Sequence, residues 1–203
     1  ESVSELVQRV PFIALTAGSS DAGARAVSSH TGSLAGSRAA YEAAFRKAGA
    51  IQARTVEELF DFAEGFARQP LPAGSGTVIL TNAGGPAILA TDACEEQGVA
   101  LATLESETTA ALRDVLPAAA AVYNPVDILG DAPASRYADA ARIILADPNV
   151  SSLVVVLTPQ AMTEAEATAI AIADAVGGTG ITTLAVFMGD STVGARAAAF
   201  RSI

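Results

Sequence analysis

The chain has 203 residues, 51% of them hydrophobic, so it can build one large or two small cored domains and is not disordered as a whole. Its 22 acidic and 12 basic side chains give a net charge of −10, and no stretch gathers Lys or Arg into a stripe, which argues against a nucleic-acid partner. No apolar run reaches the roughly 18 residues that span a bilayer. The single cysteine, Cys94, allows no disulfide within the chain and predicts a reducing, cytoplasmic setting.

Residues 1–69 carry few regular elements. Thr55 is expected to cap the last of them, because Glu58 stands at the capping-box position. The predicted elements are strand 12–15, helix 38–47, strand 51–53 and a helix after Thr55, whose buried face would hold Leu59, Phe62, Ala63 and Phe66. Two strands are too few for a complete domain, so this part would complete its sheet with sequence not present here or pack on another chain.

A stretch rich in Gly, Ser and Ala, residues 18–36, reads as a long loop between the first strand and the first helix. Loops longer than about 12 to 15 residues are usually functional. This one holds the only histidine, His30, among residues too small to make it a core filler. A neutral imidazole nitrogen can attack phosphorus or relay a proton. The alternative is a surface histidine in a flexible loop.

Residues 70–76 combine Pro and Gly without periodicity, which predicts a linker before a second βα series. The strands of that series are continuous apolar runs, as expected when helices cover both faces of a parallel sheet. The predicted elements are strand 77–81, helix 86–97, strand 99–103, helices 107–116 and 135–146, strand 152–157, helix 163–176, strand 182–187 and helix 191–200. The predicted fold class is therefore α/β, with flavodoxin-like open parallel sheets in one partial and one complete domain.

The turn Asn82-Ala83-Gly84-Gly85-Pro86 joins a strand directly to a helix. Proline suits the first helical turn, and the glycines, which adopt positive φ freely, would let backbone N–H groups face an anion. It is neither the dinucleotide pattern nor a P-loop. The alternative is an ordinary turn.

The segment 124–131 is expected at the carboxyl end of a strand, where open α/β sheets bind ligands. Asp127 or Asp131 could accept hydrogen bonds there from a substrate or a histidine. The alternative for Asp131 is a turn residue before Pro133.

Five motifs in order along the chain closely resemble the NDP-forming acyl-CoA synthetases, and most of all their ADP-forming acetate–CoA ligases, relatives of succinyl-CoA synthetase. The motifs are Gly23-Ala24-Arg25-Ala26, Ser29-His30-Thr31-Gly32-Ser33-Leu34-Ala35-Gly36, Thr81-Asn82-Ala83-Gly84-Gly85-Pro86, Asn124-Pro125-Val126-Asp127 and Leu157-Thr158-Pro159-Gln160-Ala161-Met162. The resemblance implies that residues 1–69 end a flavodoxin-like domain with a phosphohistidine loop and that 77–203 form a second such domain.

The resemblance also implies roles for individual residues. His30 would accept phosphate from an acyl phosphate and deliver it to ADP, and Glu1 would orient it. Asn82, Ala83, Gly84 and Gly85 would bind the phosphate, and Asp127 and Gly130 would contact substrate or loop, with no metal ligand in the chain. Thr16 and Ser19 depart from the family, which usually has a lysine and an arginine there.

As the resemblance implies, CoA, ATP or ADP, and Mg²⁺ would bind mainly outside this chain, on a CoA-binding Rossmann domain and an ATP-grasp domain of the same enzyme. The enzyme would be a homo- or hetero-oligomer. Alternatively, the chain is a regulatory pseudo-synthetase module of a protein acetyltransferase, without catalysis of its own. A flavin-binding, flavodoxin-like protein would need an aromatic-rich loop that the chain lacks.

Overall fold

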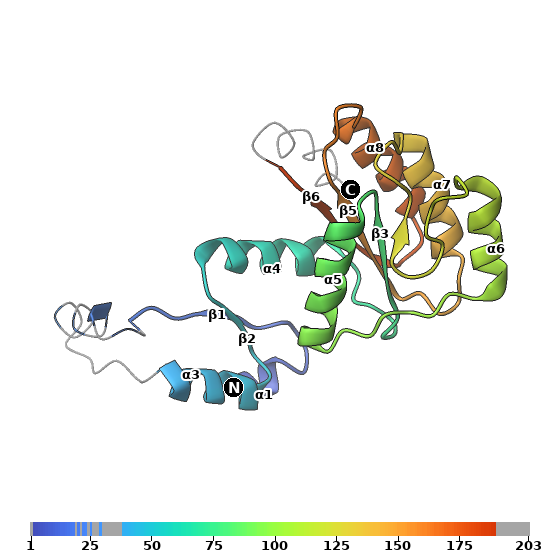
Figure 1. Ribbon diagram of the computed structural model, residues 1–203. Coiled ribbons are helices and arrows are strands. Elements are labelled where there is room, and N and C mark those ends of the chain that lie inside the picture. Colours follow the sequence, from blue (N-terminus) through green and yellow to red (C-terminus); the bar gives the residue numbers. More distant parts are fainter. Residues whose placement is uncertain are drawn as a thin grey trace. The chain divides into compact units, whose positions relative to one another are not determined.

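The computed structural model describes residues 2–18, 20, 22, 23, 25, 29 and 38–189. The chain divides into two compact units, Glu1–Arg68 (unit 1) and Gln69–Ile203 (unit 2). Figure 1 draws both, and each is described by itself. No helix of the described residues is long and apolar enough to cross a membrane.

Unit 1 contains a two-stranded parallel sheet with short helices. Its elements are α1 (Val3–Leu6), β1 (Ile13–Leu15), α3 (Arg38–Ala48), β2 (Ile51–Ala53) and α4 (Val56–Arg68). The strands pair in register from Ile13 with Ile51 to Leu15 with Ala53. Thr55 caps α4 as expected, because its hydroxyl accepts the Glu58 amide at 3.0 Å while the Glu58 carboxylate accepts the Arg54 amide at 2.7 Å.

The buried face expected on α4 is not buried within unit 1. No residue of this helix is fully buried, and Phe62 and Phe66 are 36% and 37% exposed. Two strands of three residues give a helix of 13 residues too little sheet to cover its apolar stripe.

The described residues inside the predicted loop 18–36 are not all irregular. Ala22, Gly23, Arg25 and Ser29 are helical. The Ser20 hydroxyl accepts the Gly23 amide at 3.1 Å, and a Cβ on Gly23 would stand 3.0 Å from the Gly18 Cα. Glycine at position 23 therefore allows a close backbone approach.

Unit 2 is built on a four-stranded parallel sheet in the order β4-β3-β5-β6. Figure 1 shows α5 on one side of this sheet and α7 on the other. Buried Val78, Leu80, Leu153 and Val155 lie at the centre of the core. The elements are β3 (Thr77–Thr81), α5 (Gly84–Gln97), α6 (Ser106–Val115), β4 (Val126–Asp127), α7 (Ala134–Leu145), β5 (Ser152–Leu157), α8 (Ala165–Val176) and β6 (Thr182–Phe187).

Four details of unit 2 differ from the sequence expectation, and one of them is that helix α8 begins at Ala165, two residues after the predicted start. Residues 99–103 form no strand and make a single bridge, from Leu101 to Thr77. Strand β4, which no periodicity signals, has two residues. Helix α5 begins at Gly84, two residues before the predicted start. The predicted helix 191–200 lies outside the described residues.

Candidate functional site

The ends of three parallel strands form the candidate site in unit 2. Thr81, the last residue of β3, pairs with Asp127 on one side and with Val156 on the other. The segments that follow these strands therefore leave the sheet at one edge, the carboxyl edge. In open α/β sheets ligands bind at this edge.

Asn82 joins two of these segments. Its side chain is buried, and its amide nitrogen donates to the Thr158 carbonyl at 2.8 Å while its oxygen accepts the Thr158 amide at 2.8 Å. The carboxamide thus ties the end of β3 to the end of β5, and it acts as a fixed support of the site.

The amino end of α5 opens onto the same edge. The Ala83 amide donates to the Thr81 hydroxyl at 3.2 Å, and Pro86 has no amide hydrogen. Among the described residues no acceptor takes the amides of Gly84 and Gly85. These two N–H groups, at the positive end of the helix dipole, can donate to an anion.

The expectation that glycine serves here through positive φ is wrong. Gly84 and Gly85 lie in the first turn of α5, and neither has positive φ. A Cβ on Gly85 would have no neighbour within 4 Å, and one on Gly84 would stand 3.5 Å from Asp127 Oδ2. The absence of side chains leaves the approach to the amides open.

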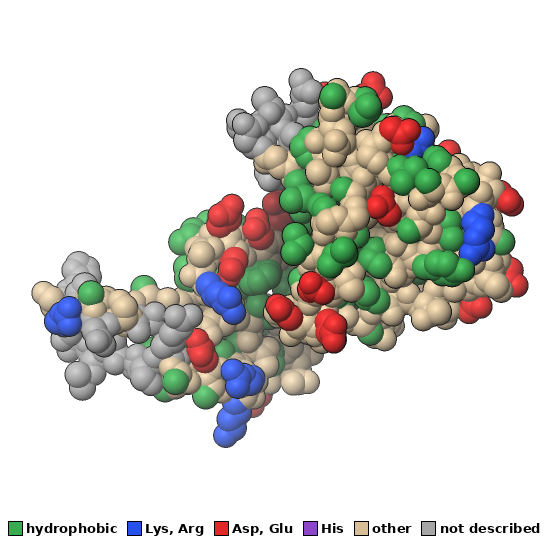
Figure 2. Space-filling model, in the orientation of Figure 1, with side chains coloured by type: hydrophobic (Ala, Val, Ile, Leu, Met, Phe, Trp, Pro, Cys, Tyr) green, Lys and Arg blue, Asp and Glu red, His purple; other side chains and the backbone are tan. Residues whose placement is uncertain are grey.

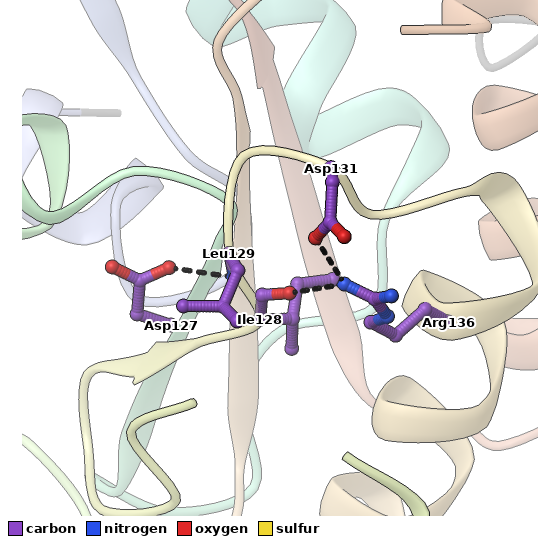
Figure 3. A network of polar contacts seen from close by, with 5 residues as sticks. All are labelled: Asp127, Ile128, Leu129, Asp131 and Arg136. Carbon is purple, nitrogen blue, oxygen red and sulfur yellow. Dashed lines mark hydrogen bonds and ion pairs between the residues drawn. The ribbon is translucent and has the colours of Figure 1, made fainter. Parts of the chain in front are cut away.

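Asp127 faces this amino end from β4. Its Oδ1 accepts the Leu129 amide at 2.9 Å, as Figure 3 shows. Leu129 has a φ of 72°, a backbone conformation that non-glycine residues rarely adopt and that is concentrated at functional sites. A Cβ on Gly130 would lie 3.7 Å from Gln160 Cγ and 3.8 Å from the Asn82 carbonyl oxygen, which places Gly130 at the same edge.

Asp131 points to an arginine of α7. Arg136 Nη1 donates to Asp131 Oδ1 at 2.6 Å and to the Ile128 carbonyl at 3.0 Å (Figure 3). The hydrogen bond from Arg136 holds the pKa of Asp131 below its usual value. Asp131 thus serves the turn between β4 and α7.

The side chains of Tyr137 and Asn124 hydrogen-bond to the strands β3 and β5 that carry the site. The buried Tyr137 hydroxyl donates to the Val156 carbonyl at 3.2 Å, and burial, with the Asp127 charge, raises its pKa. The Asn124 side chain accepts the Ile79 amide at 3.0 Å and donates to the carbonyls of Thr77 and Ala102 at 2.8 and 2.9 Å. Sequence reasoning missed both roles, although Asn124 stands in one of the motifs.

His30 and Glu1, the two predicted catalytic residues, lie outside the described residues. The structure therefore brings together Asn82, Ala83, Gly84, Gly85, Asp127 and Gly130 of the predicted site. Among the described residues no group of three His, Cys, Asp or Glu side chains could hold a metal ion.

Two known family models match the chain. A family model described as a Ligase-CoA domain matches residues 77–200, which is more than half of the chain. The chain belongs to the Ligase-CoA domain family. A second model, described as a succinyl-CoA ligase like flavodoxin domain, matches residues 1–66. The predicted resemblance is confirmed.

Curated relatives of this Ligase-CoA chain are named as ADP-forming ligases. It is 49% identical to acetate–CoA ligase [ADP-forming] I of Archaeoglobus fulgidus, over 77% of this chain and 22% of the relative. It is 46% identical to the alpha subunit of acetate–CoA ligase [ADP-forming] II of Pyrococcus furiosus, over 77% of this chain and 34% of the subunit. The chain thus spans 22% and 34% of the length of these two relatives, and nothing in the comparisons supports the acetyltransferase-module alternative.

A solved structure confirms the parallel α/β fold. It is the dinucleotide forming acetyl-coenzyme A synthetase 1 of Ca. Korarchaeum cryptofilum, in complex with phosphate and ADP. The TM-score is 0.86 at 31% identity, over 98% of this chain and 47% of that chain.

Proposed function

We propose that this chain is part of an ADP-forming acyl-CoA synthetase of the acetate–CoA ligase type, which interconverts acyl-CoA, ADP and phosphate with acid, CoA and ATP. The observation that carries the proposal is the pair of amides of Gly84 and Gly85 at the carboxyl edge, for which the described part of the chain provides no acceptor. These amides belong to a chain whose curated relatives are named as ADP-forming acetate–CoA ligases, which also supports the proposal.

His30 is the phosphoryl carrier in this proposal. One neutral imidazole nitrogen attacks the phosphorus of an acyl phosphate, so that an N–P bond forms and the P–O bond to the acyl group breaks. The acid leaves as a carboxylate, and the other ring nitrogen keeps its proton. Attack by ADP on the phosphohistidine then forms ATP and restores the neutral ring. Glu1 orients the imidazole.

The amino end of α5 stabilises the phosphoryl group. The amides of Gly84 and Gly85 donate to its oxygens, and a helix terminus contributes about 0.3 to 1 kcal/mol per exposed charge, more when partly buried. Asn82 and Ala83 hold the turn through their bonds to Thr158 and Thr81. Asp127 Oδ2, the oxygen not bonded to Leu129, is the acceptor for a donor group of substrate or loop.

The remaining parts of the reaction fall outside this chain. CoA, ATP or ADP, and Mg²⁺ bind mainly to a CoA-binding Rossmann domain and an ATP-grasp domain of the same enzyme. In this account residues 1–69 end one flavodoxin-like domain, 70–76 are a linker and 77–203 are the second domain. The enzyme is a homo- or hetero-oligomer in the cytoplasm.

A glycine comparison tests the anion site. The complete enzyme carrying Gly85→Val is incubated with labelled ATP and Mg²⁺, and its phosphoenzyme level and thermal midpoint are measured. We expect at least about a tenfold loss of phosphoenzyme, because a side chain covers the amides that stabilise the developing charge. The thermal midpoint should change little, since the Cβ has open space.

Gly65→Val is the matched control. Gly65 lies inside α4, and its Cβ would also meet nothing within 4 Å. This variant should keep its phosphoenzyme level. Near-normal phosphorylation of a folded Gly85→Val enzyme would show that the glycine pair is only a turn and that the phosphate is held elsewhere.

A further inference from the structure

A hollow lies in unit 1. Its volume is about 460 Å³, and Thr16 and Arg54, which follow β1 and β2, border it where the two parallel strands end. The face of α3 supplies the opposite wall. The lining residues are Thr16, Glu42, Phe45, Arg46, Ala50, Gln52, Ala53 and Arg54.

The charge of this hollow differs from that of the chain. Arg46 and Arg54 outnumber the one acid of the lining, Glu42, so the lining is positive in a chain of net charge −10. On the face drawn in Figure 2 the described Lys and Arg side chains lie in separate small groups. The two cations of the lining attract an anion that the net charge of the chain repels.

Among the described residues no ion pair reaches either Arg46 or Arg54. Guanidinium groups donate in a planar fork that matches the oxygens of a phosphate. The Thr16 hydroxyl and the Gln52 carboxamide, 3.5 Å apart, add neutral donors and acceptors between the strands.

The size and the apolar wall point to an organic phosphate. A volume of about 460 Å³ lies within the range of small-molecule sites and far exceeds the needs of one phosphate ion. Half-buried Phe45, whose ring stacks on Tyr41 at a centroid distance of 6.2 Å, offers an apolar surface beside the cations. The lining thus provides for phosphate oxygens and for a larger, partly apolar body.

We propose that this hollow binds the diphosphate of a nucleotide, with Arg46 and Arg54 on the phosphate oxygens and Phe45 against the organic part. Free ADP and the nucleotide end of CoA share this chemistry. The proposal does not depend on phosphoryl transfer, so its failure would leave the role proposed for His30 unaffected.

Calorimetric titration of the 203-residue chain tests the site with four probes: ADP, CoA, inorganic pyrophosphate and adenosine. We expect saturable binding of ADP, of CoA or of both, weaker binding of pyrophosphate and no measurable binding of adenosine. Binding of only one of the first two identifies the source of the diphosphate. Arg46→Gln and Arg54→Gln should each weaken binding at least about tenfold, as for a lost charged hydrogen bond.

Lys47→Gln is the control, because Lys47 neighbours Arg46 on α3 but does not line the hollow. It should change the affinity by less than about twofold, since an exposed charge outside the site is screened by salt. Far-UV circular dichroism checks that each variant is folded. The proposal is overturned if no phosphate compound binds, if adenosine binds as well as ADP, if pyrophosphate binds as tightly as ADP, or if Lys47→Gln weakens binding as much as the arginine variants do.

Discussion

Replacing Asn82 tests whether this side chain is a structural support of the carboxyl edge. Its carboxamide makes two hydrogen bonds of 2.8 Å to the Thr158 backbone and is buried. Asn82→Ala removes both bonds and leaves the Thr158 amide and carbonyl without these partners. At about 0.5 to 1.5 kcal/mol for each bond, plus part of the cost of two unsatisfied groups, the free energy of unfolding should fall by about 2 to 3 kcal/mol.

Urea unfolding followed by far-UV circular dichroism measures this change. Asn82→Asp should be at least as destabilising, because the carboxylate still accepts the Thr158 amide but faces the Thr158 carbonyl without a proton. The control is Asn149→Ala, which removes bonds of 3.0 and 2.8 Å to Thr103 and Glu105 at an exposed position. It should cost less than about 1 kcal/mol. An Asn82→Ala variant as stable as the Asn149→Ala control would refute the structural role.

Three further predictions concern the same unit. Burial raises the pKa of Asp147, but hydrogen bonds from Thr108, Asn149 and Glu105 outweigh burial and lower it. The ionised carboxylate therefore stabilises the folded chain fully above the ordinary value of 3.8, and this contribution disappears as pH falls through the lower folded-state pKa. The difference in free energy of unfolding between wild type and Asp147→Asn should thus shrink below pH 3.8 when urea unfolding is measured at acid pH. Because burial and Asp127 raise the pKa of Tyr137 above the ordinary value of 10, the phenolate absorbance that wild type shows and Tyr137→Phe lacks should appear only above pH 10 in an alkaline titration, and its appearance at pH 10 or below would contradict the buried position. A Cβ on Gly76 would collide with the Asn149 carbonyl oxygen, so Gly76→Ala should lower the free energy of unfolding by about 1 to 3 kcal/mol. The control Gly85→Ala should change this free energy little, because a Cβ there has open space. Equal urea midpoints for the two variants would show that the backbone at Gly76 adjusts freely.

Local patterns predicted four strands with their bounds. Burial on both faces explains the continuous apolar runs of β3 and β5, whereas Leu184 and Val186 of β6 are each 49% exposed. The strands 51–53, 77–81, 152–157 and 182–187 have the predicted bounds. Strand β4 could not be predicted in the same way. It has only two residues, and the Asn124 side chain, which no periodicity reports, continues its pairing along β3.

The candidate site was predictable as a set of motifs but not as a set of contacts. The sequence indicates that Asn82 to Gly85 open a helix, yet it gives no sign that Asn82 bonds Thr158, 76 residues away. It places Asp127 near a strand end but does not reveal the positive φ of Leu129. Those features depend on which strands become neighbours. For α4 the sequence predicted the helix correctly but not its surroundings. The apolar face that its helical period predicts to be buried is exposed, because the sheet of unit 1 is too small to cover it.

The central claim is that His30 carries the phosphoryl group, and phosphorylation of the complete enzyme tests it most directly. Incubation with labelled ATP and Mg²⁺ should give a phosphoprotein that is labile to acid and stable to alkali, as expected for a phosphorus–nitrogen bond. The label should disappear in His30→Ala, while the far-UV spectrum stays the same. Undiminished label in a folded His30→Ala enzyme would contradict the account.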